Sequence, residues 1–506
     1  MYRPMLIVLA LMLLCISLDA PTAQATDWPQ FQANAQRTGY SPDSIAPPYR
    51  ARWIWCGPTQ TLRNHASNAA WPDDLTTRDN YNYPMPSSVN FTLADFVQPV
   101  VANSRVFVGD QQGSVYAINY DDGSNLWTAA LPGGTIHSAA VSGTTVVFAS
   151  ITGYVRGYDV SNGSVRWTVN TGRSITSAPL VFNSVLYVGD HAGNVRAIDP
   201  ANGNVSWTRK LGGPIQGCMA ASGTKIYVPA DNMTVYALNT SNGTIANQRV
   251  VTGQSFRGLW PVITGSLVYV QSAMVPCAGS EYVAEDVCQQ ATSITDEGTR
   301  MIAFQSGQGG YSYTSTDWEH LTALNLSDLT KPFSIGCGPS EGCGTSAEPP
   351  VVRADGKAIC YWKTKYPKLT NASMFGSNYA ADLSAIDPTN GTRIVIDNGR
   401  LAGVRMETDN MYGLSIGGNY MFMRQRFRGT QGINMADSTS RYISQESRYR
   451  DGGNYTSDII YDSTNDSVED APGTPEPDMS GRCPATVSGT LLLISEPYCI
   501  TAIEHY

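Results

Sequence analysis

The sequence predicts an all-β propeller of eight blades, with seven blades as the alternative. A fifteen-residue stretch, residues 113–127 (GSVYAINYDDGSNLW), returns at residues 153–167 and at residues 193–207, forty residues apart each time. Each copy places Asn-Gly or Asp-Gly between two alternating apolar runs, and the chain ends in the middle of a further unit. A fixed period of this length indicates supersecondary units that are stacked or arranged in a ring.

Each copy is interpreted as a β-hairpin, because Asn-Gly and Asp-Gly tolerate the left-handed backbone of a tight turn. The residues before each hairpin supply two more short strands, for example residues 99–102 and 105–109 before the first copy. Four strands in forty residues make one propeller blade. The expected blades are residues 97–130, 137–170, 177–210, 217–250, 258–325 around an insertion, 350–391, 412 to beyond 433, and 491 to the C-terminus. The count falls to seven if the seventh, which has the weakest repeat pattern, is misread.

The last blade lacks its fourth strand, and the missing strand lies at the other end of the chain. Residues 491–494 and 499–506 supply the second and third strands, after which the chain stops. Residues 49–56 (YRARWIWC) alternate like the end of a hairpin that has no first half. We expect this N-terminal strand to complete blade 8 and close the ring, because closure removes exposed sheet edges.

Residues 27–506 are therefore expected to form one propeller domain behind a secretory signal at residues 1–26. Arg3, the apolar run at residues 5–18 and the small residues around Ala25 indicate the signal, and the run is too short to span a membrane. Three stretches without the repeat are interpreted as insertions, at about residues 57–96, 273–318 and 444–482. We expect a secreted, extracellular chain, periplasmic in a bacterial host, without stable membrane insertion.

The repeat Ala-x-Asp/Asn-x-x-Asn/Asp-Gly-x-x-x-Trp resembles the tryptophan-docking repeat of the PQQ-like (quinoprotein dehydrogenase-like) propellers. Residues 27–41 (DWPQFQANAQRTGYS) also resemble the opening segment of such proteins. The resemblance implies the propeller fold and leaves the activity open, because the family includes enzymes, assembly scaffolds and sensors.

Four tryptophans recur at one position of the repeat or in the closing strand: Trp53, Trp127, Trp167 and Trp207. We expect them to pack between neighbouring blades, each burying about 150 to 250 Å², rather than to form a ligand cage. The fourth blade departs from the pattern, with Asn247 in the place of the tryptophan.

In propellers of this kind, the loop that enters each blade and the turn after its second strand face the wide end of the central channel. By this resemblance, the entering loops form a mixed polar funnel that suits a small polar ligand or a peptide, and suits bound water equally well. The candidate ligand residues at this channel mouth are His137, Thr176, Gln216, Arg257, Arg405 and Glu407.

The enzymes of the family use a quinone held over a calcium ion, with an Asp base and, in many, a disulfide between adjacent cysteines. This sequence has no adjacent cysteines, no Cys-x-x-Cys-His and no histidine cluster with metal-ligand spacing. Catalytic and cofactor-binding residues therefore stay unassigned, and no cofactor or metal is predicted. The net charge of −9 and the pI near 5.1 provide no basic stripe for a nucleic acid.

The leading hypothesis for function is a secreted, non-catalytic propeller that acts as a binding or structural scaffold in an extracellular or surface assembly. Its partners would be proteins or glycans that bind the propeller faces. The alternative is a PQQ- and calcium-dependent quinoprotein oxidoreductase acting on alcohols or sugars.

The repeat register predicts a disulfide between Cys56 and Cys499. If Trp53 stands in the place of Trp127, Cys56 corresponds to position 130, and the same frame places Cys499 at position 114. These positions lie opposite each other in the hairpin, where Cα atoms are about 4.5 to 5.5 Å apart and within disulfide reach. A secreted chain permits the oxidation.

The other cysteines leave an odd number in the mature chain. Local bridges are expected for Cys277 with Cys288 and for Cys337 with Cys343, leaving Cys218, Cys360 and Cys483. Cys483 is the rival partner of Cys499. At least one thiol should therefore stay outside these bridges or join another chain, which leaves a homo-oligomer open.

Asparagine sequons are more numerous than composition alone explains, although the hairpin turns themselves create several of them. Turns at blade ends are exposed and tolerate glycan, so we expect glycosylation. The sequons are Asn90, Asn162, Asn204, Asn232, Asn239, Asn242, Asn325, Asn371, Asn390, Asn454 and Asn465.

Overall fold

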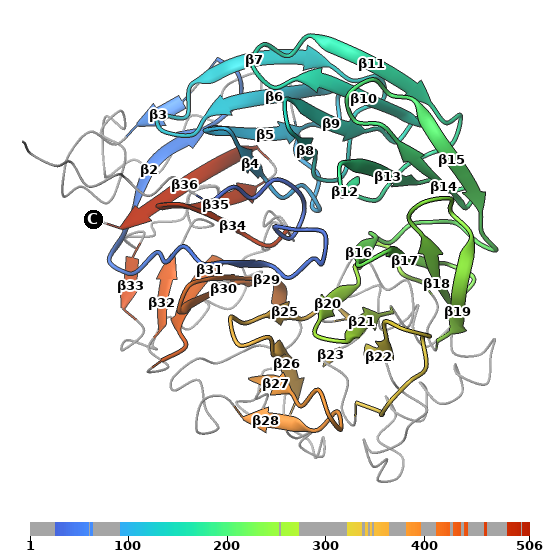
Figure 1. The fold of residues 1–506 in the computed structure, drawn as a ribbon. Coiled ribbons are helices and arrows are strands. Elements are labelled where there is room, and N and C mark those ends of the chain that lie inside the picture. Colours follow the sequence, from blue (N-terminus) through green and yellow to red (C-terminus); the bar gives the residue numbers. More distant parts are fainter. Residues whose placement is uncertain are drawn as a thin grey trace, which may run out of the picture.

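Eight β-sheets surround a central axis in the computed structural model, and the described residues contain no helix (Figure 1). The predicted all-β propeller of eight blades is thereby confirmed. The structure describes residues 26–59, 61–63, 92–251, 255–272, 321–335, 340–342, 345–346, 349–363, 381–395, 411–425, 429–436, 440–443, 460–462, 483–496 and 498–505.

Blades 1 to 4 are four-stranded antiparallel meanders that keep the forty-residue register. Blade 1 contains β4 (Val100–Ala102), β5 (Arg105–Gly109), β6 (Ser114–Asn119) and β7 (Asn125–Ala130). Blade 2 contains β8 (Ala140–Ser142), β9 (Thr145–Ala149), β10 (Tyr154–Asp159) and β11 (Val165–Asn170). Blade 3 contains β12 (Leu180–Phe182), β13 (Val185–Gly189), β14 (Asn194–Ile198) and β15 (Val205–Lys210). Blade 4 contains β16 (Ala220–Ser222), β17 (Lys225–Ala230), β18 (Thr234–Asn239) and β19 (Ile245–Val250).

Blades 5 to 8 are less regular. Blade 5 contains β20 (Val262–Thr264), β21 (Leu267–Gln271) and β22 (Leu321–Asn325), and a separate pair is formed by β23 (Ser340–Gly342) and β24 (Thr345–Ser346). Blade 6 contains β25 (Val351–Val352), β26 (Ala358–Lys363), β27 (Ala381–Ile386) and β28 (Arg393–Val395). Blade 7 contains β29 (Met411–Gly417), β30 (Tyr420–Gln425), β31 (Gly429–Asn434), β32 (Ser440–Ile443) and β33 (Ile460–Asp462), with β1 (Tyr40–Ser41) at its inner edge. Blade 8 contains β34 (Thr486–Ser488), β35 (Leu491–Glu496), β36 (Cys499–His505), β2 (Tyr49–Trp55) and β3 (Thr61–Arg63).

Two blades carry strands where the sequence suggested insertions. β3 lies in the stretch 57–96 and pairs with β2, and β33 lies in the stretch 444–482 and pairs with β32. Each adds an outer strand that covers a sheet edge, a role that needs backbone pairing and no apolar alternation. The third strand of blade 7 also starts before the expected Ile433, because residues 429–432 (GTQG) pair through the backbone without an apolar pattern.

Ring closure follows the predicted register. β2 pairs with β36 as an antiparallel strand of blade 8, with Trp53 opposite Ala502. In blade 1, Trp127 lies opposite Ala117 in the same way. The N-terminal strand therefore completes the hairpin that the C-terminus begins.

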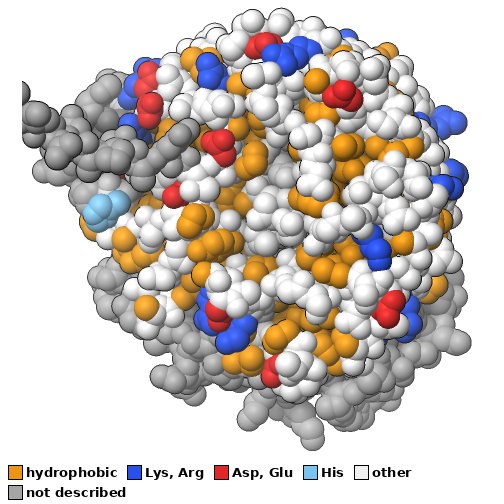
Figure 2. Space-filling model, in the orientation of Figure 1, with side chains coloured by type: hydrophobic (Ala, Val, Ile, Leu, Met, Phe, Trp, Pro, Cys, Tyr) orange, Lys and Arg blue, Asp and Glu red, His pale blue; other side chains and the backbone are white. Residues whose placement is uncertain are grey.

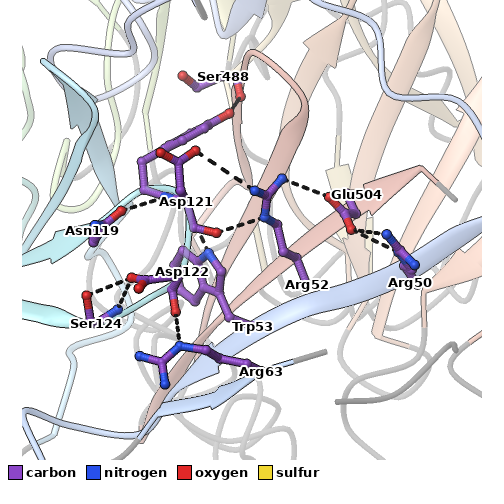
Figure 3. A network of polar contacts seen from close by, with 11 residues as sticks. Arg50, Arg52, Trp53, Arg63, Asn119, Asp121, Asp122, Ser124, Ser488 and Glu504 are labelled. Atoms are coloured by element: carbon purple, nitrogen blue, oxygen red, sulfur yellow. Dashed lines mark hydrogen bonds and ion pairs between the residues drawn. The ribbon is translucent and has the colours of Figure 1, made fainter. Parts of the chain in front are cut away.

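A charged network fastens this closed blade to blade 1 (Figure 3). Arg50 and Arg52 both bind the Glu504 carboxylate, with N to O distances of 2.7 and 3.0 Å. Arg52 Nε also donates to the Asp121 carbonyl at 2.8 Å, and Arg63 Nε donates to the next carbonyl of that turn. The contacts join both chain ends to the first blade.

The repeating tryptophans pack between blades. Each indole Nε1 donates to a backbone carbonyl of the next blade's turn at 2.9 to 3.0 Å: Trp53 to Tyr120, Trp127 to Val160, Trp167 to Pro200, and Trp207 to Thr240. The turn glycine beneath each ring has a positive φ, and a Cβ there would lie within 3 Å of the indole: Gly123, Gly163, Gly203 and Gly243. Glycine is thus needed both for the turn and for the close approach of the ring.

Different residues make the corresponding contacts where blade 4 meets blade 5. Asn247 stands in the tryptophan's place, and Lys225 Nζ and the Tyr227 hydroxyl donate to the Leu326 carbonyl, at 3.3 and 2.8 Å. Phe333 of blade 5 lies against the turn glycine of blade 6. Blades 4 and 5 are therefore still joined by a side-chain donor to a backbone carbonyl, but the donors are an amine and a hydroxyl instead of an indole.

Residues 26–43, which we call the axial segment, run around the inner rim of the ring and contact every blade (Figure 1). Trp28 exchanges two backbone hydrogen bonds with Val101 of blade 1, and the Gln30 amide exchanges two with the Val181 backbone of blade 3. In blades 2 and 4 to 7, the N–H groups of Val141, Ala221, Ile263, Val352 and Ile416 donate to the carbonyls of Pro29, Ala35, Gln36, Thr38 and Gly39 at 2.7 to 2.9 Å. Gly489 of blade 8 donates to the Asp43 carboxylate. The segment thereby covers the inner edges of the eight sheets.

Candidate functional site

His137 lies inside the packed centre of the ring, with 3% of its surface exposed. Its Nδ1 accepts the Ser138 backbone N–H at 2.9 Å, so the neutral ring carries its hydrogen on Nε2, which lies 3.1 Å from Cys218 Sγ. Phe31 of the axial segment packs edge-on against the imidazole. Burial, and secondarily the charge of Arg37, lowers the pKa of His137 to about 3. This neutral, enclosed side chain serves packing.

Arg37 anchors the axial segment from a fully buried position. Its guanidinium donates to three carbonyls, those of Phe31 at 2.6 Å, Met219 at 2.9 Å and Pro179 at 3.2 Å. Burial lowers the pKa of Arg37 to about 10 and raises that of the neighbouring Cys218 thiol to about 11. At neutral pH the pair is therefore a cation beside an uncharged thiol, and the cation ties the segment to blades 3 and 4.

Three of the predicted mouth residues converge with two that were not predicted. Thr176, Gln216 and Arg257 lie on the loops that enter blades 3, 4 and 5. His191 and Asp231 come from the turns after the second strands of blades 3 and 4. Thr176 Oγ1 lies 2.8 Å from His191 Nε2, and the Gln216 amide donates to the Asp231 carboxylate. We call these five residues the mouth cluster.

The charges in the mouth cluster are unequally neutralised. Asp231 Oδ1 accepts the Phe256 N–H at 2.8 Å, and its Oδ2 accepts Gln216 and the Ser255 hydroxyl. Burial first, and then the nearby Arg257, lower the pKa of His191, so its imidazole is neutral at neutral pH. Arg257 is exposed, and its guanidinium makes no ion pair with any residue that the structure describes.

The turn carboxylates of the regular blades stabilise their own turns. Asp110 accepts two backbone N–H groups of its turn and the Tyr116 hydroxyl, each at 2.7 Å. Asp190 pairs with Arg196 at 2.5 Å. Both carboxylates are fully buried and already hold their donors.

The family resemblance implies a quinone held over a calcium ion, which would need carboxylate oxygens as ligands. Calcium takes six to eight oxygen ligands, carboxylates prominent among them. Within the described ranges, no three His, Cys, Asp or Glu side chains lie close enough to hold a metal ion. Asp110, Asp190 and Asp231 are each committed to donors of the protein. These three carboxylates are therefore occupied by donors of the protein itself.

Several predicted residues lie outside the described part of the chain: Arg405, Glu407, Cys277, Cys288, Cys337, Cys343, Asn90, Asn371, Asn454 and Asn465. Cys56 and Cys499 share a small buried cluster with Ile54, and the Cys499 thiol donates to Glu496 Oε2 at 3.0 Å. Their disulfide stays a prediction.

The described sequons occupy two environments. Asn162, Asn204, Asn232, Asn242 and Asn390 are exposed. Asn239 and Asn325 are half-buried, and their Nδ2 atoms donate to threonine hydroxyls at 2.7 and 2.8 Å. The exposed sites are the better acceptors for glycan, and glycosylation stays a prediction.

His191 and Asp231 were not among the predicted site residues, although both occupy one position of the repeat. They share one repeat position with Gln111 and Ile151, directly after the residue that starts the turn. Among the four regular blades, this position is ionisable only in blades 3 and 4.

Comparison with known proteins places the fold in a family. The family model described as outer membrane protein assembly factor BamB matches residues 66–328, just over half of the chain. The chain belongs to this PQQ-like β-propeller family. A curated relative, the outer membrane protein assembly factor BamB of Yersinia pestis, is 28% identical over 100 residues. That match spans 20% of this chain and 24% of the relative's length.

Solved structures agree on the architecture. The quinohemoprotein alcohol dehydrogenase of Comamonas testosteroni superposes with a TM-score of 0.56 at 12% identity, covering 96% of this chain and 81% of that enzyme. The quinohemoprotein alcohol dehydrogenase ADHIIG of Pseudomonas putida HK5 gives 0.51 at 11% identity, covering 95% and 80%. Similarity at this level of identity establishes the shared propeller fold alone.

Proposed function

We propose that this chain is a secreted, non-catalytic propeller that acts as a binding or structural scaffold in an extracellular or surface assembly. The axial segment carries the proposal, because the protein's own residues 26–43 cover the inner strands of all eight blades. The faces and the outer wall of the ring then remain for partners. The name of the curated relative, outer membrane protein assembly factor BamB, supports a protein partner. In a bacterial host we place the chain in the periplasm.

The surface suits proteins or glycans better than nucleic acids. On the face shown in Figure 2, lysines and arginines are scattered mainly around the rim, and hydrophobic side chains lie between polar ones nearer the centre. The chain carries a net charge of −9, which disfavours polyanions. The described residues include no helix with the length and apolarity of a membrane span.

Native size and cofactor turnover together test the proposal. The chain extracted from its source under mild conditions should elute with partners, well above its own 54.6 kDa. The purified chain, incubated with PQQ and calcium, should show no dye reduction with alcohols or sugars. Elution as a lone monomer would contradict the scaffold. Dye reduction that a calcium chelator abolishes would identify an oxidoreductase instead.

A further inference from the structure

We propose that the mouth cluster binds a carboxylate group of an acidic protein segment. This inference rests on the scaffold function proposed above and assigns a chemistry to one of its contacts. The cluster is built from five separate loops and turns of blades 3 to 5, so its five side chains are brought together by the packing of neighbouring blades.

The accessible charge at this place is positive. Asp231 is half-buried and already accepts three hydrogen bonds, and Asp190 is fully buried against Arg196. Arg257 is exposed and makes no ion pair within the described residues. A second exposed arginine, Arg173, lies on the same loop as Thr176. The local excess of positive charge therefore contrasts with the acidic chain as a whole.

The donor set matches a carboxylate. A guanidinium presents parallel N–H groups that a carboxylate accepts as a bidentate pair. When His191 carries its hydrogen on Nε2, it donates to Thr176 Oγ1, and the threonine hydroxyl hydrogen can turn toward a bound oxygen. Because the pKa of His191 is lowered, the imidazole stays neutral and does not repel Arg257 at neutral pH.

The loop that carries Arg257 is held before any ligand arrives. The Arg257 N–H donates to Ser255 Oγ at 3.0 Å, and the Phe256 N–H donates to Asp231. Gly258, with φ of 72°, then turns the chain sharply into blade 5. A preorganised loop loses less conformational entropy on binding, which favours a specific contact.

Fluorescence anisotropy with labelled peptides tests the proposal on the full chain. The probes are a tetraglutamate peptide and its tetraglutamine counterpart, and the variants are Arg257→Gln and the matched control Arg249→Gln. Arg249 is exposed on the outer strand β19 and is not part of the mouth cluster. We expect tetraglutamate to bind at least about tenfold more tightly than tetraglutamine. Arg257→Gln should weaken tetraglutamate about tenfold, and Arg249→Gln should leave it unchanged.

Each contrary result has one meaning. No binding of tetraglutamate, equal affinity for both peptides, or equal weakening by both variants would overturn the carboxylate site. Competition by inorganic phosphate but not by acetate would overturn it in favour of a phosphate ligand. None of these results would contradict the scaffold function if the native chain still elutes with partners. Calcium-dependent turnover would contradict the scaffold function even if tetraglutamate binds.

Discussion

Oxidation of Cys56 and Cys499 should lock the ring where the two chain ends meet. Trp55 lies opposite Ile500 in the closing hairpin, so the next residues on the two strands, Cys56 and Cys499, are also opposed. Both thiols belong to one buried cluster. The opposed Cα atoms of such strands are about 4.5 to 5.5 Å apart, a separation that a disulfide spans without moving the backbone.

The expected stabilisation follows from the length of chain that the bridge closes. A loop from residue 56 to residue 499 gives about 6 kcal/mol in the chain-entropy model, and measured disulfides deliver about 0 to 5 kcal/mol. The bridge also removes the hydrogen bond from Cys499 Sγ to the buried Glu496, which costs about 1 kcal/mol or more. We therefore expect a gain of about 3 to 5 kcal/mol in the free energy of unfolding.

Non-reducing peptide mapping and urea unfolding check this prediction. The wild-type chain should yield a joined Cys56 and Cys499 peptide and should lose stability when a reductant is added. The Cys56→Ala variant is the matched control. The reductant should lower its stability less than that of the wild type, because only the other predicted bridges remain to be broken. A peptide joining Cys499 to Cys483, or alkylation of both Cys56 and Cys499 without reductant, would refute the reasoning. The structure favours the bridge between Cys56 and Cys499, since Cys483 lies in a different core cluster.

Three further predictions concern the packed interior. Trp127→Phe removes the indole donor to the buried Val160 carbonyl and should lower the free energy of unfolding in urea by about 1 to 3 kcal/mol. Trp207→Phe should lower it less, because Trp207 is more exposed. Equal losses for the two variants would contradict this reasoning. His137 has a pKa of about 3 in the folded chain and about 6.5 in the unfolded chain, so below pH 6.5 only the unfolded chain gains this proton. The free energy of unfolding should therefore fall by a few kcal/mol as the pH is lowered toward 3. The His137→Gln variant should show a weaker dependence of stability on pH. Arg37→Lys keeps the charge but cannot reach three carbonyls, so it should destabilise by about 2 to 4 kcal/mol; an unchanged unfolding midpoint would show that the axial segment is not anchored there.

The regular blades could be read from the sequence because their signals are local. A hairpin turn such as Asn162-Gly163 specifies its own geometry, and the strand alternation beside it has a period of two residues. Ring closure was predictable as well, because the half-hairpin at residues 49–56 and the unfinished blade at the C-terminus complement each other. The outer strands β3 and β33 were not, since they are held by backbone pairing that any sequence can supply.

The candidate site could be predicted only in part. Thr176, Gln216 and Arg257 were found because the repeat numbers the loops that enter each blade, and this numbering is a property of the sequence. The same numbering placed His137 in the same set, although the side chain is buried. Repeat position thus fixed which loop a residue occupies, but it did not fix which side of the loop faces solvent.

The sequence by itself determined the blade frame, the register of closure and the places of the docking tryptophans, because each depends on spacing along the chain. The tertiary structure decided what fills the centre of the ring. The axial segment hydrogen-bonds to the inner strands of blades 1 to 7 and to Ser488 and Gly489 of blade 8, and only the closed ring brings those edges around one axis. His137 is then enclosed by Phe31, and His191 is brought beside Thr176. The physical reason is that burial and charge pairing depend on which distant loops meet, and no local pattern encodes that meeting.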